Sequence, residues 1–283
     1  DAVCGDYNVD AGEGCDDGNR DDGDACSSDC TPTDRPWGVL DDLDVAVSGA
    51  LVSMGRIGNT LVLTLPALTV AMLLSLVLGT WAGWRRGAVD VVVRGFSALT
   101  SSVPAFFVGL LLVTLFAEWW QVLPSGGVFS PGIHNDGVQA VVVDRVRHAV
   151  LPVTVLVLFW TGRFVRQVRS AVIAAAAGDY VRTVRMKGAS TSWIVRHHVL
   201  KNAAVPLVTL VGLSLPALFG GALLTETVFA WPGLGRLQYD AILQNDSYVA
   251  VVVFLISAAM VLLGSLLADV LVFVLDPRTR GRR

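Results

Sequence analysis

The stretch GDYVRTVRMKGA, residues 178–189, continues as STSWIVRHHVLKN, residues 190–202, and this segment is the most informative part of the chain. Apolar residues recur at helical spacing on each side of Gly188, which predicts one helix before this glycine and a second helix after it. The positions that carry the pattern are Val181 and Val184, then Trp193, Ile194, His197 and Leu200. Ser190 or Ser192 is suited to cap the second helix. A short amphipathic helix of this kind either docks into a partner or lies on anionic lipid headgroups, and its residues alone do not choose between the two.

Apolar blocks lie on both sides of this segment. They cover about residues 58–84, 96–117, 149–168, 203–224 and 248–275. A helix of about 20 apolar residues crosses the hydrocarbon core of a bilayer. Prolines lie inside or at the ends of the blocks, at Pro66, Pro104, Pro152, Pro206 and Pro216. Such prolines are tolerated where neighbouring helices satisfy the freed backbone groups, so the pattern predicts an all-α polytopic membrane protein with a packed bundle.

The composition excludes several other classes. The chain has 283 residues, of which 53% are hydrophobic and only 16% are charged, and its mean hydropathy is +0.61. Soluble domains carry about 25% charged residues. An ordinary soluble domain, a disordered or collagen-like chain and a basic nucleic-acid-binding domain are therefore poor matches.

The net charge of −3 hides two segments of opposite sign. Residues 1–44 hold 14 acidic and two basic residues, a charge of −12, and residues 45–283 hold 19 basic and ten acidic residues, a charge of +9. Cytoplasmic loops of membrane proteins are enriched in Lys and Arg. With the acidic segment outside, 15 of the 21 basic residues face the cytoplasm, against six in the opposite orientation. The charges therefore predict an external N-terminal segment and a cytoplasmic C-terminus. At the end of the third block, Arg163, Arg166 and Arg169 are expected to extend toward the membrane interface.

The acidic segment holds all the cysteines, at Cys4, Cys15, Cys26 and Cys30. An even number of cysteines in a stretch without core residues predicts disulfides in an oxidising compartment, with the pairing left open. Zinc is less favoured because only the last two cysteines are closely spaced and no His is near. Calcium is less favoured because Asp22 and Ser28 stand at the sixth and twelfth loop positions, where an EF-hand needs Gly and Glu.

The same run resembles a short cysteine-rich repeat of bacterial surface and secreted proteins, with Tyr7 and Ala25 where that repeat has Gly. This resemblance implies a location outside the cytoplasm. Residues 1–34 are therefore assigned to a small disulfide-stapled extracytoplasmic segment, and residues 35–57 to an external linker.

The informative segment resembles the signature loop of ABC-transporter permeases, closest to the dipeptide/oligopeptide branch. The residues that carry the resemblance are DYVRT at 179–183, KG at 187–188, LKNA at 200–203 and Pro206. Further matches are NTL at 59–61, ETVFAWPGLGR at 226–236 and DPR at 276–278. The resemblance implies the helix bundle of a type I ABC importer permease over residues 58–276.

Residues 168–202 would then be a cytoplasmic coupling loop that docks into a groove of an ATPase subunit. The residues implied in that role are Asp179, Tyr180, Arg182, Arg185, Lys187, Gly188, Ala189, Trp193, Ile194 and His197. Two acidic residues are candidates for the pathway or a gate. Glu226 is alternatively a solvated surface residue, and Asp269 is alternatively a packing contact or an interfacial residue beside Arg278. No metal site is expected.

No phosphate-binding Gly-x4-Gly-Lys-Ser/Thr motif is present, and no hydrolase motif either, so the chain is not expected to be an enzyme. The resemblance implies that ATP and Mg are bound by two partner ABC ATPase subunits. It also implies a second permease subunit in a heterodimer, an extracytoplasmic solute-binding protein, and a place in the bacterial inner membrane. The solute stays open between peptides, nickel and glutathione.

Two other classes of function remain as alternatives. A secondary transporter would need intramembrane charges or inverted repeats, and a surface-displayed anchor would explain the acidic segment but not the loop. The family usually has six spans, whereas five apolar blocks are present here. Because the sequence begins with Asp1, we expect the first helix to lie upstream; the alternative is a five-span protein.

Overall fold

The computed structural model describes residues 39–133, 137–201, 203, 214 and 222–275. The chain divides into two compact units, Asp1–Leu51 and Val52–Arg283. The predicted cysteine-rich segment and its disulfides lie outside the described residues.

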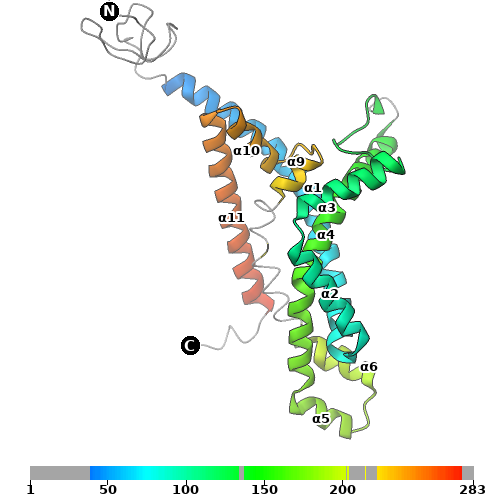
Figure 1. Ribbon diagram of the computed structural model, residues 1–283. Helices are drawn as coiled ribbons and strands as arrows, with labels where there is room; N and C mark the ends of the chain where they lie inside the picture. The colour runs from blue at the N-terminus through cyan, green and yellow to red at the C-terminus, as the bar shows by residue number, and fades with distance from the viewer. Residues whose placement is uncertain (1–38, 134–136, 202, 204–213, 215–221, 276–283) are drawn as a thin grey trace, which may run out of the picture. The chain divides into compact units, whose positions relative to one another are not determined.

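Helices account for the regular structure of the described residues, which contain no strand (Figure 1). The longer helices are α1 (Val39–Arg85), α2 (Ala88–Ser102), α3 (Ala105–Val113), α4 (Val138–Ala176), α10 (Leu234–Leu243) and α11 (Ser247–Leu275). The shorter ones are α5 (Asp179–Met186), α6 (Thr191–Ile194), α9 (Leu223–Val228) and two π-helices, η1 (Thr114–Trp119) and η3 (Val195–Val199). The prediction of an all-α protein is confirmed for these residues.

Two helices in the described ranges are long and apolar enough to cross a membrane, over Gly55–Arg85 and Ser247–Leu267. They contain the predicted span 58–84 and most of the predicted span 248–275. A third crossing results if Ala88–Ser102 and Ala105–Trp119 are counted as one bent span. The predicted span 149–168 lies inside the 39-residue helix α4, which is not among these candidates. Most of the predicted span 203–224 lies outside the described residues.

The predicted span 96–117 is not a straight helix, because the chain bends by 96° between α2 and α3. Pro104 causes the break. A residue before proline is driven out of the helical region, and Val103 is extended with φ −96° and ψ 132°. Pro104 then precedes the first turn of α3, where its missing N–H costs nothing.

The helices α1 and α4 pack closely because α1 presents a small residue at every fourth position. The stripe consists of Ala67, Ala71, Ser75, Gly79 and Gly83, all buried. Such stripes let helix backbones approach each other inside a membrane. A Cβ added to Gly79 would lie 2.7 Å from the Val168 Cβ, and one added to Gly83 would lie 2.9 Å from the Val172 Cβ. The residue numbers of the contacting positions rise together, from Gly79 and Val168 to Gly83 and Val172, so α1 and α4 run parallel.

We expect Gly83→Leu to lower the thermal unfolding midpoint of the purified protein in detergent. A Cβ here also meets the Arg169 carbonyl oxygen at 2.9 Å, and backbone cannot yield as a flexible side chain would. Overpacking of this kind costs about 1–3 kcal/mol. Gly95→Leu is the matched control, because nothing lies within 4 Å of a Cβ added there. Equal midpoints for the two variants would contradict this account of the α1–α4 contact.

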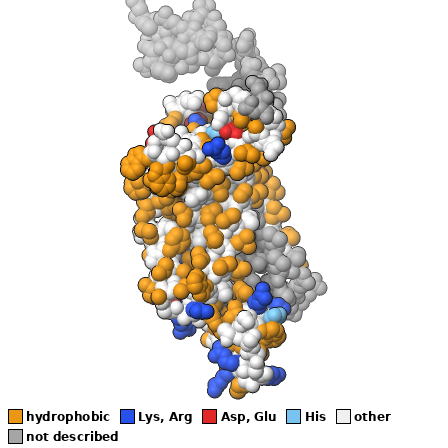
Figure 2. All heavy atoms as spheres, turned by 90° about the vertical axis from the view of Figure 1, so that its right-hand side faces the viewer, with side chains coloured by type: hydrophobic (Ala, Val, Ile, Leu, Met, Phe, Trp, Pro, Cys, Tyr) orange, Lys and Arg blue, Asp and Glu red, His pale blue; other side chains and the backbone are white. Residues whose placement is uncertain are grey.

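Charge is distributed unevenly over the face of the molecule in Figure 2. Hydrophobic side chains cover the long middle of this face, and Lys and Arg side chains gather toward the end where Figure 1 places α5 and α6. Exposed apolar residues of this number, such as Leu73, Val77, Val92 and Leu99 at 60–69% exposure, are typical of a surface that faces lipid.

Candidate functional site

The segment after α4 folds as a helix, a break and a second helix. Asp179 lies in the first turn of α5 and Arg185 in its last turn, where each charge complements the helix dipole. Gly188 has φ +83°, and its N–H donates to the Arg185 carbonyl at 3.0 Å. Glycine takes this left-handed conformation without strain at a helix end. The prediction that Gly188 separates two helices is confirmed.

The second helix begins at a serine cap, as predicted. The Ser190 hydroxyl accepts a hydrogen bond from the Trp193 N–H at 3.4 Å, so of the two candidate serines Ser190 is the cap. After α6 the helix widens into the π-helix η3, which the apolar spacing did not predict.

An apolar cluster fixes this loop to the end of α4. Val181 of α5, Ile194 of α6 and Val199 of η3 are 0–4% exposed and pack with Val168 and Val172 of α4. Ile194 was predicted to contact an ATPase. The structure instead buries it completely among residues of its own chain, and the partly buried Ala189 packs against the same cluster.

The other predicted coupling residues are exposed: Asp179, Tyr180, Arg182, Arg185, Lys187, Gly188, Trp193 and His197. Trp193 is 44% exposed, and its ring stacks on His197 at a centroid distance of 4.7 Å. The Tyr180 hydroxyl donates to the Ala175 carbonyl at 2.7 Å, which ties α5 to the end of α4. Arg185 lies 5.9 Å from the centre of the Trp84 ring of α1. The loop therefore presents a basic and aromatic outer surface over an apolar anchor.

A second polar site joins two stretches that lie far apart in the sequence. Glu226 of α9 is fully buried. One of its carboxylate oxygens accepts from the Thr60 hydroxyl at 2.7 Å and the other from the Arg236 N–H at 3.0 Å. Thr60 in turn accepts from the Leu234 N–H at 2.9 Å. Residues 59–61 and 226–236, which each carried the resemblance separately, thus form one hydrogen-bonded site.

Asn59 and Trp231 complete this site. The Trp231 Nε1 donates to the Asn59 carbonyl, and the Asn59 Nδ2 donates to the Pro232 carbonyl, both at 3.0 Å. The side chain of Arg145 donates to the Asn59 Oδ1 at 2.9 Å. These bonds connect α1 and α4 to the segment between α9 and α10.

Gly233 leaves the space that the Glu226 carboxylate occupies. A Cβ on Gly233 would lie 2.2 Å from the carboxyl carbon of Glu226. Burial raises the pKa of Glu226, and the hydrogen bonds from Thr60, Arg236 and Gly235 partly offset this rise. Glu226 is therefore enclosed and hydrogen-bonded and is not at a solvated surface. Asp269, the other candidate for the pathway, is exposed on α11.

The described residues hold no group of three or more His, Cys, Asp or Glu side chains that could bind a metal ion.

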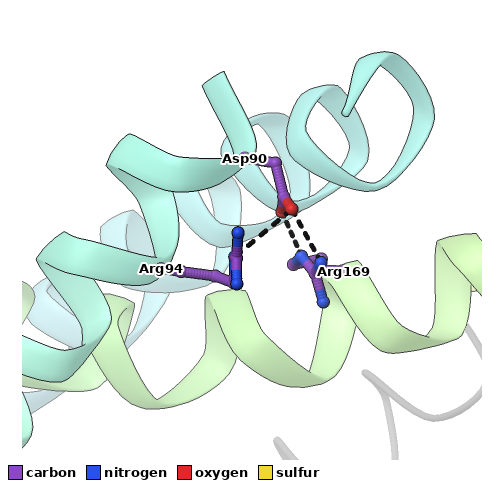
Figure 3. A network of polar contacts seen from close by, with 3 residues as sticks. All are labelled: Asp90, Arg94 and Arg169. Atoms are coloured by element: carbon purple, nitrogen blue, oxygen red, sulfur yellow. Dashed lines mark hydrogen bonds and ion pairs between the residues drawn. The ribbon is translucent and has the colours of Figure 1, made fainter. Parts of the chain in front are cut away.

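One polar contact was missed by the sequence analysis. Asp90 of α2 and Arg169 of α4 form a paired, charge-assisted interaction, with the Arg169 Nη2 donating to one Asp90 oxygen at 2.8 Å and its Nε to the other (Figure 3). Arg94 lies 3.3 Å from the same carboxylate. Arg169 was expected at the lipid interface, but it faces α2. A lone acid at the start of an apolar segment was the available signal, and its partner lies 79 residues away.

The described residues thus form a bundle of helices with an exposed apolar surface, which carries a helix–break–helix loop on a buried apolar cluster. Residues 75–281 match the family described as "Binding-protein-dependent transport system inner membrane component". The chain belongs to this family. Members of this family are transport components of the inner membrane and not enzymes.

Curated relatives agree with this assignment. The chain is 33% identical over 226 residues to the oligopeptide transport system permease protein AppB of Bacillus subtilis (strain 168), covering 80% of this chain and 70% of that protein. It is 32% identical over 269 residues to the dipeptide transport system permease protein DppB of Escherichia coli (strain K12), covering 87% and 79%.

Solved structures show the same fold. An inward-facing MetNI methionine ABC transporter structure aligns with a TM-score of 0.59 at 18% identity, covering 80% of this chain and 97% of that chain. An amino acid ABC transporter aligns with a TM-score of 0.54 at 16% identity, covering 84% and 96%. The expected helix bundle of an ABC importer permease is confirmed.

Proposed function

We propose that this chain is the permease subunit of an ATP-driven importer that moves peptides or similar small solutes, delivered by an extracytoplasmic binding protein, across a bacterial inner membrane. The family description supports the dependence on a binding protein. Two relatives are permease proteins of oligopeptide and dipeptide transport systems, which supports peptides as the solute.

The complex would contain a second, related permease subunit and two ABC ATPases, which bind ATP and Mg. The sequence has no phosphate-binding loop of its own. ATP binding would draw the two ATPases together and move the loop between α4 and η3. Alternating access would follow as a rigid-body rearrangement of the two permease subunits.

The observation that carries this proposal is that one set of loop residues is buried against α4 while another set is exposed. Ile194 and its apolar neighbours hold the loop on α4, while Trp193, His197, Arg182 and Lys187 are exposed. An exposed tryptophan on a helix that is packed in place is a typical hot spot of a protein interface. A helix that only rested on headgroups would place its apolar face in the membrane, but here that face packs against α4.

The basic loop would face the cytoplasm, and the acidic N-terminal segment would lie on the opposite side of the membrane. The directions of the helices agree with this topology. The helices α1 and α4 run parallel, and α2 runs antiparallel to them, so α1 and α4 both end on the side of the loop. In a membrane, the excess of Lys and Arg near α5 and α6 favours the cytoplasmic side for that end.

Co-purification distinguishes this function from the alternatives. A tagged chain expressed with its genomic neighbours should recover two ATPase subunits and a second permease. A secondary transporter or a surface anchor would recover no ATPase, and that result would refute the importer.

We expect Trp193→Ala to reduce recovery of the ATPase subunits by about tenfold or more. Truncating an interface tryptophan typically costs at least about 2 kcal/mol. The substitution alters none of the buried side chains that hold the loop on α4. Trp119→Ala is the matched control, because Trp119 is also exposed, at 75%, but lies in η1. Equal ATPase recovery with both variants would show that the loop surface is not the docking surface.

A further inference from the structure

The contact between Asp90 and Arg169 is enclosed and has a defined geometry. Their side chains are 9% and 24% exposed, whereas that of Arg94 is 57% exposed. The guanidinium group of Arg169 bonds to both carboxylate oxygens of Asp90. Two parallel bonds of this kind fix direction as well as distance. Arg94 adds a third, looser contact from the next turn of α2 (Figure 3).

This pair is the polar end of a long contact between α2 and α4. Val93 packs with Val165 one turn further along α2. The Ser97 hydroxyl then donates to the Gly162 carbonyl at 2.5 Å. As the residue number rises on α2 it falls on α4, so the two helices run antiparallel in a fixed register.

Arg169 also lies within the part of α4 that holds the loop. Its neighbours Val168 and Val172 form the apolar cluster with Ile194. The same two turns of α4 therefore contact the loop through Val168 and Val172 and contact α2 through Arg169. At its other end, α2 leads into the bend at Pro104.

Apolar contacts alone do not fix the axial position of one helix against another, because ridges can move past one another by a turn. A buried ion pair adds little net stability, since removing both charges from water costs about as much as their attraction returns. Its best-attested role is to specify register. A bidentate pair at the loop end of α2 would make α2 follow any axial or rotational movement of α4.

We propose that Asp90 and Arg169 are positioning residues that transmit movement of the loop, through α4, to the bent helix pair α2–α3. This inference rests on the proposed function, because the movement originates at the ATPases. In each transport cycle the ion pair stays closed, and α2 and α4 move as one body. Without it, ATP hydrolysis would continue but the bend at Pro104 would follow the loop less closely, because only the contacts of Val93 and Ser97 would remain.

The test uses the complete importer with its binding protein in proteoliposomes, supplied with Mg-ATP and radiolabelled alanyl-alanine. We expect Arg169→Gln to lower the ratio of dipeptide taken up to ATP hydrolysed by about tenfold, within the range of typical coupling between sites. Recovery of the ATPases and the basal rate of hydrolysis should stay within about twofold of the unaltered complex. Arg169→Lys keeps the charge but loses the paired geometry, so we expect an intermediate ratio.

Arg166→Gln is the matched control, because Arg166 is an exposed arginine of the same helix. If Arg169→Gln impairs assembly, Asp90→Asn removes the ion pair with almost no change of shape, and the same loss of ratio is expected. A ratio for either variant equal to that of Arg166→Gln would overturn the inference. If the unaltered complex neither recovers ATPases nor takes up dipeptide, the proposed function itself fails.

Discussion

Replacing Ile194 by Asp should abolish uptake and remove the ATPase subunits from the purified complex. The side chain is fully buried in the cluster that joins the loop to α4. A carboxylate there would have no cation among the cluster residues, and an unpaired charge in an apolar site costs several kcal/mol. Opening of the cluster returns the carboxylate to water, so we expect the loop to separate from α4.

Limited proteolysis measures this separation directly. Cleavage after Arg182, Arg185 and Lys187 should become at least about tenfold faster in the variant, because local opening exposes the backbone of α5. Met186→Asp is the matched control, since Met186 lies in the same loop and is 74% exposed. If Ile194→Asp has the cleavage rate and the ATPase recovery of Met186→Asp, the cluster does not hold the loop.

Comparison with Trp193→Ala separates support from contact. Both variants are expected to lose the ATPases, but only the variant at Ile194 should become sensitive to protease. An amphipathic pattern in the sequence cannot make this distinction. Spacing shows that one face of a helix is apolar, but it does not show whether the covering surface belongs to the same chain or to another. For that reason Ile194 was assigned to the interface together with Trp193.

Local features of the loop were predicted correctly because short-range chemistry determines them. Gly188 tolerates a positive φ, and a serine hydroxyl satisfies the first N–H groups of a helix. The widened turn at Val195–Val199 has no such signal. The break in the second apolar block depends on Pro104. Prolines inside membrane helices are often accommodated without a sharp bend. The presence of this proline therefore did not predict a bend of 96° between α2 and α3.

Long-range contacts were the main omission. Asp90 and Arg169 are 79 positions apart, and each is ordinary by itself. Residues 59–61 and 226–236 were noted because they resemble a family, yet nothing in either stretch showed that they meet. Glu226 could be a pathway residue or a solvated one until Thr60 and the backbone of Arg236 were found at its two oxygens.

Glu226→Ala is expected to lower the stability of the purified protein by about 3 kcal/mol or more, since each buried donor left without an acceptor costs about 1–3 kcal/mol. The substitution removes the acceptor of the Thr60 hydroxyl and of the Arg236 N–H together. It also loosens the connection of α1 to the segment between α9 and α10. Thermal unfolding in detergent measures the loss, and uptake should fall with it.

Glu118→Ala is the matched control for charge, because Glu118 is an exposed glutamate in η1. Gly233→Val tests the same site by filling the space of the Glu226 carboxylate, since a Cβ at Gly233 would overlap that carboxylate. Both Glu226→Ala and Gly233→Val should destabilise the protein, and Glu118→Ala should not. A stable Gly233→Val variant would mean that the carboxylate is not held where the structure places it.

Dependence on pH tests whether Glu226 is buried as a charge. Its pKa is raised in the folded protein because burial penalises the carboxylate. The folded protein therefore holds the proton more tightly than the unfolded chain does. The stabilisation from this group is fully present below the ordinary pKa of a glutamate, about 4.3, and is lost as the pH rises through the raised pKa.

Glu226→Gln resembles the protonated acid at every pH, with its oxygen toward the Arg236 N–H and its amide toward Thr60. The unfolding temperature of this variant, relative to the unaltered protein, should therefore rise between about pH 4 and pH 8. A constant difference over this range would show that water reaches the carboxylate and that the site is open.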